Sequence, residues 1–153
     1  MTNDSRITLS DGRGLSFSEI GDASGSTVFY FHGAPTSRLS LVPWEMEFAN
    51  RGLGVVSPDR PGYGGSSPQP GRTMSDWPTD VARLADALGI DRFIVAGQSS
   101  GGPYAVACAA LLPNRVSAAV VLAGLGAGLA LGATSAVVIW LPTALRFLRH
   151  RQR

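Results

Sequence analysis

Hydrophobic residues along the chain gather in short runs, which alternate with segments of helical length and with turns rich in glycine and proline. Continuous apolar runs lie at 28–31, 54–57 and 93–96, another apolar stretch lies at 116–122, and residues 15–20 alternate like a half-buried strand. Continuous runs are typical of parallel strands that are covered on both faces. The pattern therefore predicts an α/β fold with a parallel sheet and connecting helices.

We expect three helices between these strands, over residues 39–51, 75–88 and 100–112. The second is the clearest, because apolar residues recur at helical spacing between an expected N-cap at Ser75 and a stop at Gly89. The third ends before Pro113, which cannot continue a helix. The chain thus has the strand and helix alternation of one α/β domain or of part of one.

Composition and charge exclude several classes of function. The 153 residues are 44% hydrophobic and 16% charged, which favours a packed core over a disordered chain. Thirteen basic residues, all arginine, are offset by eleven acidic ones, and the net charge of +2 predicts no nucleic-acid partner. The lone Cys108 excludes an intrachain disulfide, and we expect no metal site and no cofactor. The first ten residues lack the apolar stretch of a signal peptide, so we expect a cytoplasmic protein.

Three glycine-rich loops follow three of the predicted strands, at 32–35 (HGAP), 59–66 (DRPGYGGS) and 97–103 (GQSSGGP). In an open parallel sheet, the loops at the carboxyl ends of the strands gather at one edge, which is where ligands bind. We therefore expect the three loops to lie together and to form the functional site.

The third loop contains the pattern G-x-S-x-G, with Gly97, Ser99 and Gly101 at its fixed positions. It lies between a predicted strand and a predicted helix, which is the setting of a nucleophile elbow. Glycine is needed on both sides of the serine because side chains there would collide with the neighbouring chain. The alternative is a plain βα turn rich in glycine and serine, and this pattern alone does not decide between the two.

Together the three loops resemble those of the α/β-hydrolase superfamily, in the branch with an H-G-x-P loop, a D-x-P-G-x-G-x-S loop and a nucleophile elbow. The resemblance covers about residues 6–124. It implies that Ser99 is the serine nucleophile and that the backbone N–H groups of Ala34 and Ser100 form the oxyanion hole. The implied function is an esterase-like serine hydrolase that acts on carboxylic esters or related small acyl compounds.

The same resemblance gives His32, Gly33 and Asp59 supporting roles. His32 and Gly33 shape the oxyanion loop, and Asp59 orders its own turn through Asx-type hydrogen bonds. His32 and Asp59 look catalytic in isolation, but neither matches a triad member of the family. The alternative to these supporting roles is that His32 and Asp59 form a catalytic triad with Ser99, in an arrangement that differs from that of the family.

The other two members of a catalytic triad have no recognisable counterpart. The superfamily places an acid and then a histidine after the serine in the chain. No Asp or Glu follows Asp91, and the single histidine after Ser99 is His150, which lies among arginines. The resemblance therefore implies a hydrolase of impaired activity, because a serine without an aligned base is a poor nucleophile.

By the same resemblance, residues 1–124 form the N-terminal half of an α/β-hydrolase domain, a truncated fold with a mostly parallel sheet of about six strands. Residues 125–153 are expected to form an apolar helix with an arginine-rich tail. That helix would cover the sheet, begin the cap domain, or enter a membrane through residues 124–145, which are uncharged and long enough to span one.

An uncovered edge at 116–122 would be open to self-association or to a complementing chain. The absent acid and base leave a second interpretation of the whole chain open. In it, a non-catalytic half-fold serves as a binding module or as a membrane-associated protein.

Overall fold

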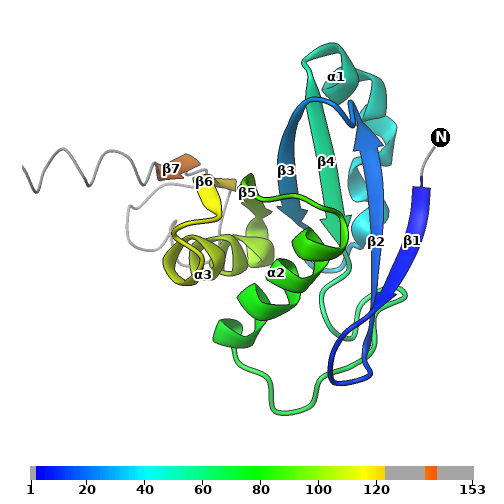
Figure 1. Cartoon of the computed structure of the whole chain (residues 1–153), viewed down its shortest axis with the longest axis vertical. Coiled ribbons are helices and arrows are strands. Elements are labelled where there is room, and N and C mark those ends of the chain that lie inside the picture. Colours follow the sequence, from blue (N-terminus) through cyan, green and yellow to red (C-terminus); the bar gives the residue numbers. More distant parts are fainter. Residues whose placement is uncertain (1–2, 123–136, 141–153) are drawn as a thin grey trace, which may run out of the picture.

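A computed structural model describes residues 3–122 and 137–140, and it contains one seven-stranded sheet in the order β1-β2-β4-β3-β5-β6-β7 (Figure 1). The strands are β1 (Asn3–Thr8), β2 (Gly14–Gly21), β3 (Ser26–Phe31), β4 (Leu53–Pro58), β5 (Phe93–Gln98), β6 (Val116–Leu122) and β7 (Val137–Trp140). The helices of the described residues are η1 (Arg38–Trp44), α1 (Glu45–Asn50), η2 (Met74–Asp76), α2 (Trp77–Ala87), η3 (Ser99–Gly101) and α3 (Gly102–Leu111), where η marks a 3₁₀ helix.

The direction of the strands confirms the predicted fold class. Strands β4, β3, β5 and β6 pair in parallel at the centre of the sheet. Strand β2 is antiparallel to both β1 and β4, so β1 runs in the same direction as the central strands. Only β2 and β7 among the described strands run the opposite way. The sheet is therefore mostly parallel, as the apolar runs predicted.

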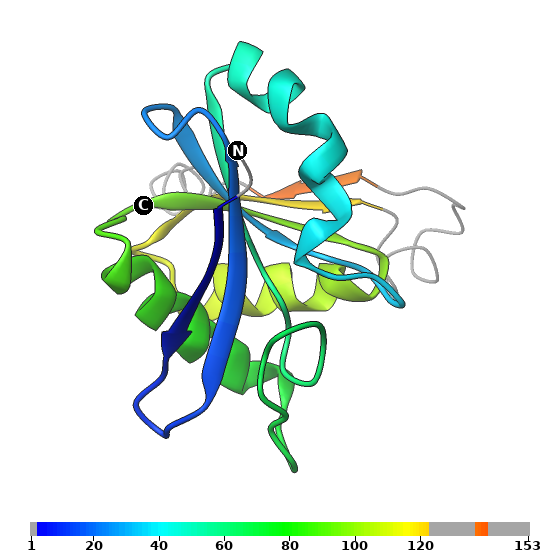
Figure 2. The ribbon, with the colours of Figure 1, turned by 90° about the vertical axis from the view of Figure 1, so that its right-hand side faces the viewer.

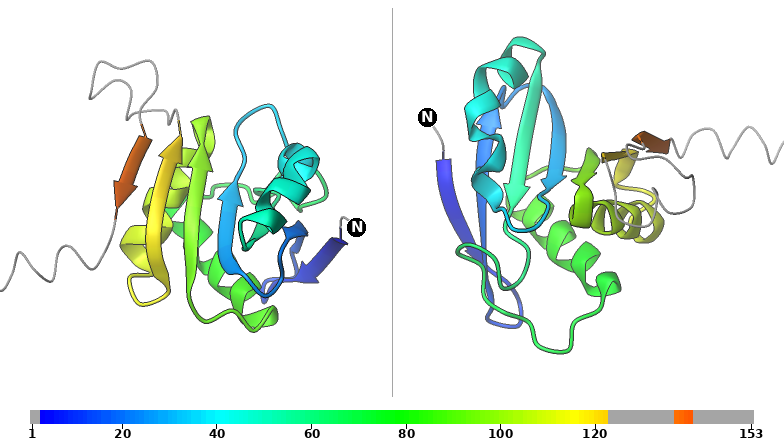
Figure 3. Two further views of the ribbon diagram at one scale, coloured as in Figure 1. Left: turned by 90° about the horizontal axis from the view of Figure 1, so that it is seen from above. Right: turned by 180° about the vertical axis from the view of Figure 1, so that it is seen from behind.

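Helices cover both faces of this sheet (Figures 2 and 3). On one face α2 and α3 pack against alternate residues of the central strands, among them Phe29, Phe31 and Val95, in the main apolar core. On the other face η1 and α1 pack against a smaller cluster that contains Tyr30 and Val55. Because successive side chains of a strand point to opposite faces, two-sided cover explains the continuous apolar runs.

The predicted helix over 75–88 is present, but its N-cap is not Ser75. Thr73 has extended backbone and forms a capping box with Asp76, in which the Thr73 N–H donates to Oδ2 of Asp76 at 2.7 Å. Ser75 lies inside the 3₁₀ turn that precedes α2, so its position as the cap was wrong by two residues. Gly89, with a φ of 69°, follows the end of α2 as predicted.

Strand β1 had no counterpart in the sequence prediction. It is an edge strand, and among the described strands it pairs only with β2, in register from Asn3 opposite Glu19 to Thr8 opposite Gly14. An edge strand buries fewer side chains than a central one, so its sequence carries a weaker apolar pattern. Pairing with β2 rather than local hydrophobicity explains the strand.

The edge of β6 is paired within the chain. Residues 137–140 form β7, which is antiparallel to β6 and places Trp140 opposite Ala119 and Val137 opposite Leu122. The predicted C-terminal apolar helix is therefore wrong at these four residues. The rest of 125–153, and the predicted domain boundary at 124–125, lie outside the described residues. No helix among residues 3–122 and 137–140 has the length and apolarity to cross a membrane.

Candidate active site

Ser99 lies on the turn between β5 and the helical segment η3–α3, at the carboxyl edge of the parallel strands. Its φ is 50°, and among the described residues it is the one non-glycine residue with a positive φ. A serine in this left-handed region is strained, and the strain persists only where the surrounding structure holds it. This backbone conformation is the one that a nucleophile elbow requires.

Two glycines allow the chain to pack closely around Ser99. A Cβ added at Gly97 would lie 2.4 Å from the carbonyl oxygen of Gly101, and one added at Gly101 would lie 2.0 Å from the carbonyl oxygen of Phe31. Both obstacles are backbone atoms, which cannot rotate away as a flexible side chain can. The elbow therefore packs directly against the end of β3, where the next loop begins.

The loop at 32–35 lies against the candidate nucleophile. A Cβ added at Gly33 would be 3.3 Å from Cβ and 3.9 Å from Oγ of Ser99. Ala34, the next residue, is exposed, and its N–H donates to no acceptor among the residues that the structure describes. The structure thus brings the loop of Ala34 to the turn of Ser99 and Ser100, as the three-loop prediction required.

His32 is fully buried and uses both ring nitrogens within the loops. Its Nδ1–H donates to the carbonyl oxygen of Gly33 at 2.7 Å, and its Nε2 accepts from the backbone N–H of Arg60 at 3.3 Å. Burial lowers the pKa of His32, so the ring is neutral near pH 7. With Nε2 already hydrogen-bonded to Arg60, His32 has no free nitrogen to take a proton from Ser99.

Asp59 is also fully buried, and its carboxylate ties two segments together. It accepts from the backbone N–H of Arg38 at 2.7 Å, from Nη1 of Arg38 at 2.7 Å, and from the N–H of Gly65 at 2.9 Å. The Gly65 bond orders the 59–66 loop, and the two Arg38 bonds attach that loop to the start of η1. Asp59 therefore has the structural partners of a loop anchor.

A family model for the alpha/beta hydrolase fold matches residues 26–149. This chain belongs to the α/β-hydrolase family. A non-heme chloroperoxidase of Streptomyces lividans is 34% identical over 121 residues, which are 76% of this chain and 43% of that protein. A bifunctional esterase/perhydrolase of Acinetobacter calcoaceticus is 31% identical over 76% of this chain and 42% of its own length.

Solved structures agree with this α/β-hydrolase assignment at the level of the fold. A probable hydrolytic enzyme from Pseudomonas aeruginosa PAO1 superposes with a TM-score of 0.72 and 21% identity, over 82% of this chain and 42% of that one. A predicted hydrolase from Thermoplasma acidophilum gives a TM-score of 0.71 and 18% identity, over 81% of this chain and 63% of that one. The chain spans less than half the length of the curated relatives named above.

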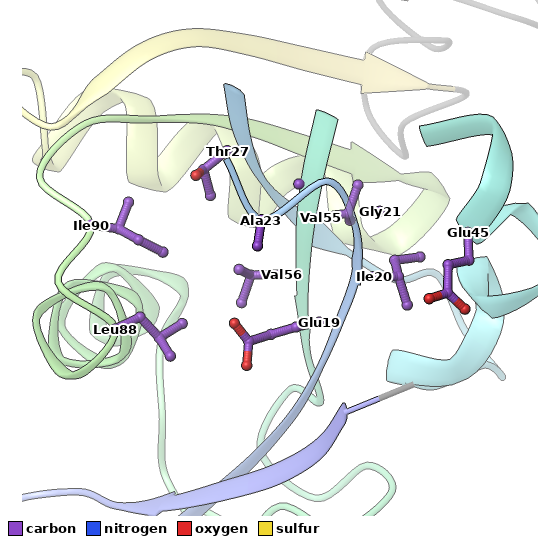
Figure 4. Close-up of a pocket in the computed structure, with 11 residues that line it drawn as sticks. Glu19, Ile20, Gly21, Ala23, Thr27, Glu45, Val55, Val56, Leu88 and Ile90 are labelled. Atoms are coloured by element: carbon purple, nitrogen blue, oxygen red, sulfur yellow. The ribbon is translucent and has the colours of Figure 1, made fainter. Parts of the chain in front are cut away.

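The described part of this α/β-hydrolase chain holds one histidine, His32, and no group of three or more His, Cys, Asp or Glu that could bind a metal ion. A pocket of about 620 Å³ exists, but Ser99 does not line it. Its walls come from the end of β2, the starts of β3 and β4 and the segment after α2, with Glu19, Thr27 and Ile90 among them (Figure 4). The pocket therefore lies at the amino ends of the parallel strands, whereas the elbow lies at their carboxyl ends.

Proposed function

We propose that this chain carries the nucleophile and the oxyanion hole of a serine hydrolase that acts on carboxylic esters or related acyl compounds. Ser99 is the nucleophile in this proposal, and the N–H groups of Ala34 and Ser100 are the oxyanion donors. The positive φ of Ser99 on a strand-to-helix turn is the observation that carries it, because strained residues of this kind are concentrated at functional sites and a nucleophile elbow requires one.

The chemistry would proceed by acyl transfer. Oγ of Ser99 attacks the carbonyl carbon of an ester, a carbon–oxygen bond forms, and the carbonyl electron pair moves onto oxygen. Two N–H donors stabilise this oxyanion as the charge develops. The electron pair on that oxygen then re-forms the carbonyl, the bond to the leaving oxygen breaks, and the leaving group takes up the Ser99 proton and departs as the alcohol. Water attacks the acyl carbon, the acyl group leaves as the carboxylic acid, and the remaining proton of the water returns to Oγ of Ser99.

The site has no available general base among the described residues. Both ring nitrogens of His32 are already hydrogen-bonded, one to the Gly33 carbonyl and the other to the Arg60 N–H. The sequence after Asp91 contains one histidine and no Asp or Glu. Oxyanion stabilisation and binding alone leave a rate enhancement of roughly 10³- to 10⁴-fold over water in enzymes whose triad is removed. We therefore propose weak activity for this chain by itself.

Labelling with a fluorophosphonate probe tests the proposal. The probe should label the chain slowly, and Ser99→Ala should abolish the label, whereas Ser10→Ala, a change at an exposed position in the β1–β2 turn, should not. Label that persists in Ser99→Ala would show that another group reacts. Absence of label after prolonged exposure at high probe concentration would contradict the proposal.

A second function is favoured by the lack of an aligned base among residues 3–122 and 137–140. In this proposal the half-fold is non-catalytic and binds another chain at an outer strand of its sheet, which is β1 or β7 because β6 is paired with β7. It predicts that the probe does not react and that the purified chain self-associates or binds a partner on size-exclusion chromatography. Probe labelling that depends on Ser99 would decide for the hydrolase.

A further inference from the structure

Arg60 bridges the two loops that approach Ser99. The residue is buried, with 3% of its surface exposed. Nη2 donates to the carbonyl oxygen of Gly33 at 3.3 Å and to Oγ of Ser100 at 3.2 Å, and Nη1 lies 3.5 Å from the carbonyl oxygen of Ser100. One guanidinium from the 59–66 loop thus contacts both the oxyanion loop and the elbow.

Aromatic rings hold this guanidinium in place. Its central carbon lies 4.6 Å from the ring centroid of Tyr63 and 4.9 Å from that of Tyr104, which are cation–π distances. The Tyr63 ring contacts the ring of His32 edge to face, and the Tyr104 hydroxyl accepts from Arg72 at 2.9 Å. Because both rings are themselves anchored, the position of the guanidinium is fixed.

The charge of Arg60 is not neutralised by an ion pair within the described residues. The adjacent carboxylate, Asp59, is bonded to Arg38 and Gly65, and Nε of Arg60 has no hydrogen-bond partner in that part of the chain. Burying an arginine without a carboxylate costs stability. Features that cost stability are concentrated at functional sites, where the cost is offset elsewhere.

The Gly33 carbonyl that Arg60 contacts belongs to the same peptide unit as the N–H of Ala34. This peptide bond is trans, so its C=O and its N–H point in opposite directions from one rigid plane. Fixing the carbonyl therefore fixes the direction of the N–H. His32 at 2.7 Å and the hydroxyl of Thr36 at 3.0 Å donate to the same oxygen.

We propose that Arg60 is a positioning residue of the oxyanion hole. Its guanidinium orients the Gly33–Ala34 peptide and holds it in a fixed relation to Ser100, so that both N–H donors aim at one point beside Ser99. Its charge also polarises the Gly33 peptide, which strengthens the opposite N–H as a donor. The proposal rests on the proposed function, since the two amides act only if Ser99 reacts.

Hydrogen–deuterium exchange tests the positioning role without any need for activity. In Arg60→Met, amides in peptides over 31–37 and 98–104 should exchange about 10-fold faster than in the wild type, as expected when a charge-assisted hydrogen bond is lost. Arg60→Lys keeps the charge and lacks the planar fork, so it should give an intermediate rate. Unchanged exchange of both peptides in Arg60→Met would overturn the proposal.

The matched control is Arg13→Met. Arg13 makes two bonds of 2.8 Å to Asp80, so its loss also removes a partly buried arginine contact, but in the β1–β2 turn. Exchange at 31–37 and 98–104 should not change in this variant. If both arginine variants raise the exchange rates of these peptides equally, the effect is a general destabilisation and the proposal is wrong. If Arg60→Met does not fold, Arg60→Lys carries the same comparison.

Probe kinetics give the chemical readout. In Arg60→Met the maximal labelling rate of Ser99 should fall about 10- to 100-fold, the scale of misplaced catalytic groups, while the probe concentration for half-maximal rate should stay within about two-fold. Equal labelling rates in wild type and Arg60→Met would overturn the role of Arg60 and leave the proposed function intact. Absence of labelling in the wild type would contradict the proposed function, and the exchange rates would still decide the role of Arg60.

Discussion

Replacing Asp59 with alanine tests the conclusion that this carboxylate is an anchor and not a triad acid. The change removes the acceptor of three hydrogen bonds, two from Arg38 and one from Gly65. Asp59 is 0% exposed and the Arg38 side chain 14%, so the ion pair lies in a poorly solvated environment. Water cannot easily replace the lost acceptor.

The size of the effect follows from this burial. Breaking a buried ion pair by removing one partner costs about 3–5 kcal/mol. For a domain of about this size, each kcal/mol lowers the melting temperature by about 2–4 °C, so Asp59→Ala should lower it by roughly 6–20 °C. Asp59→Asn keeps one acceptor oxygen and should have an intermediate effect.

Urea unfolding followed by circular dichroism measures the change in the free energy of unfolding. Asp86→Ala is the matched control, because Asp86 is 54% exposed and makes a 3.0 Å ion pair with Arg115. Exposed pairs contribute about 0–1 kcal/mol. If Asp59→Ala destabilises the chain no more than Asp86→Ala, the anchor role is wrong. A triad acid would instead lower labelling of the folded protein about 10⁴-fold.

Two further substitutions address the elbow and the buried histidine. Gly101→Ala places a Cβ 2.0 Å from the carbonyl oxygen of Phe31 and should cost about 3 kcal/mol or more and abolish labelling of Ser99; an unchanged urea midpoint would contradict this. Burial lowers the pKa of His32 below its ordinary 6.5, so the unfolded state binds the proton more readily than the folded state. The stability that His32 contributes is therefore complete above pH 6.5 and should fall as the pH drops below that value. His32→Asn should remove this decrease of the urea midpoint at low pH, and His150→Gln should leave it unchanged. The reverse result would show that His32 is not the group responsible.

The elbow was predictable because its requirements are local in the chain. Gly97 and Gly101 lie within two residues of Ser99, and the carbonyl oxygens that exclude a Cβ belong to the elbow itself or to the end of β3. A short motif can encode such a turn, because few residue types fit it. The apolar runs of β3, β4 and β5 were equally clear, since burial on both faces leaves little choice of side chain.

The errors arose where pairing partners or neighbouring caps decide the structure. Residues 137–140 read as part of a helix because their apolar side chains fit a buried helix or a buried strand equally well. Pairing with the open edge of β6 decides for a strand. Ser75 and Thr73 are both good N-caps, and the capping box with Asp76 selects Thr73. Neither choice is visible in hydrophobic spacing.

The bridge made by Arg60 depends on strand order, which the sequence does not display. The loops follow β3, β4 and β5 in the chain, but β3 lies between β4 and β5 in the sheet. This order places the loop after β4 next to the oxyanion loop, so Arg60 reaches Gly33, 27 residues away, and Ser100, 40 residues away. The H-G-x-P motif contains the peptide that bears the Ala34 N–H, whereas Arg60, one of the donors to the carbonyl oxygen of that peptide, comes from the loop after β4. A motif search therefore finds the proposed reacting groups, whereas the proposed positioning residue becomes apparent only once the strand order is known.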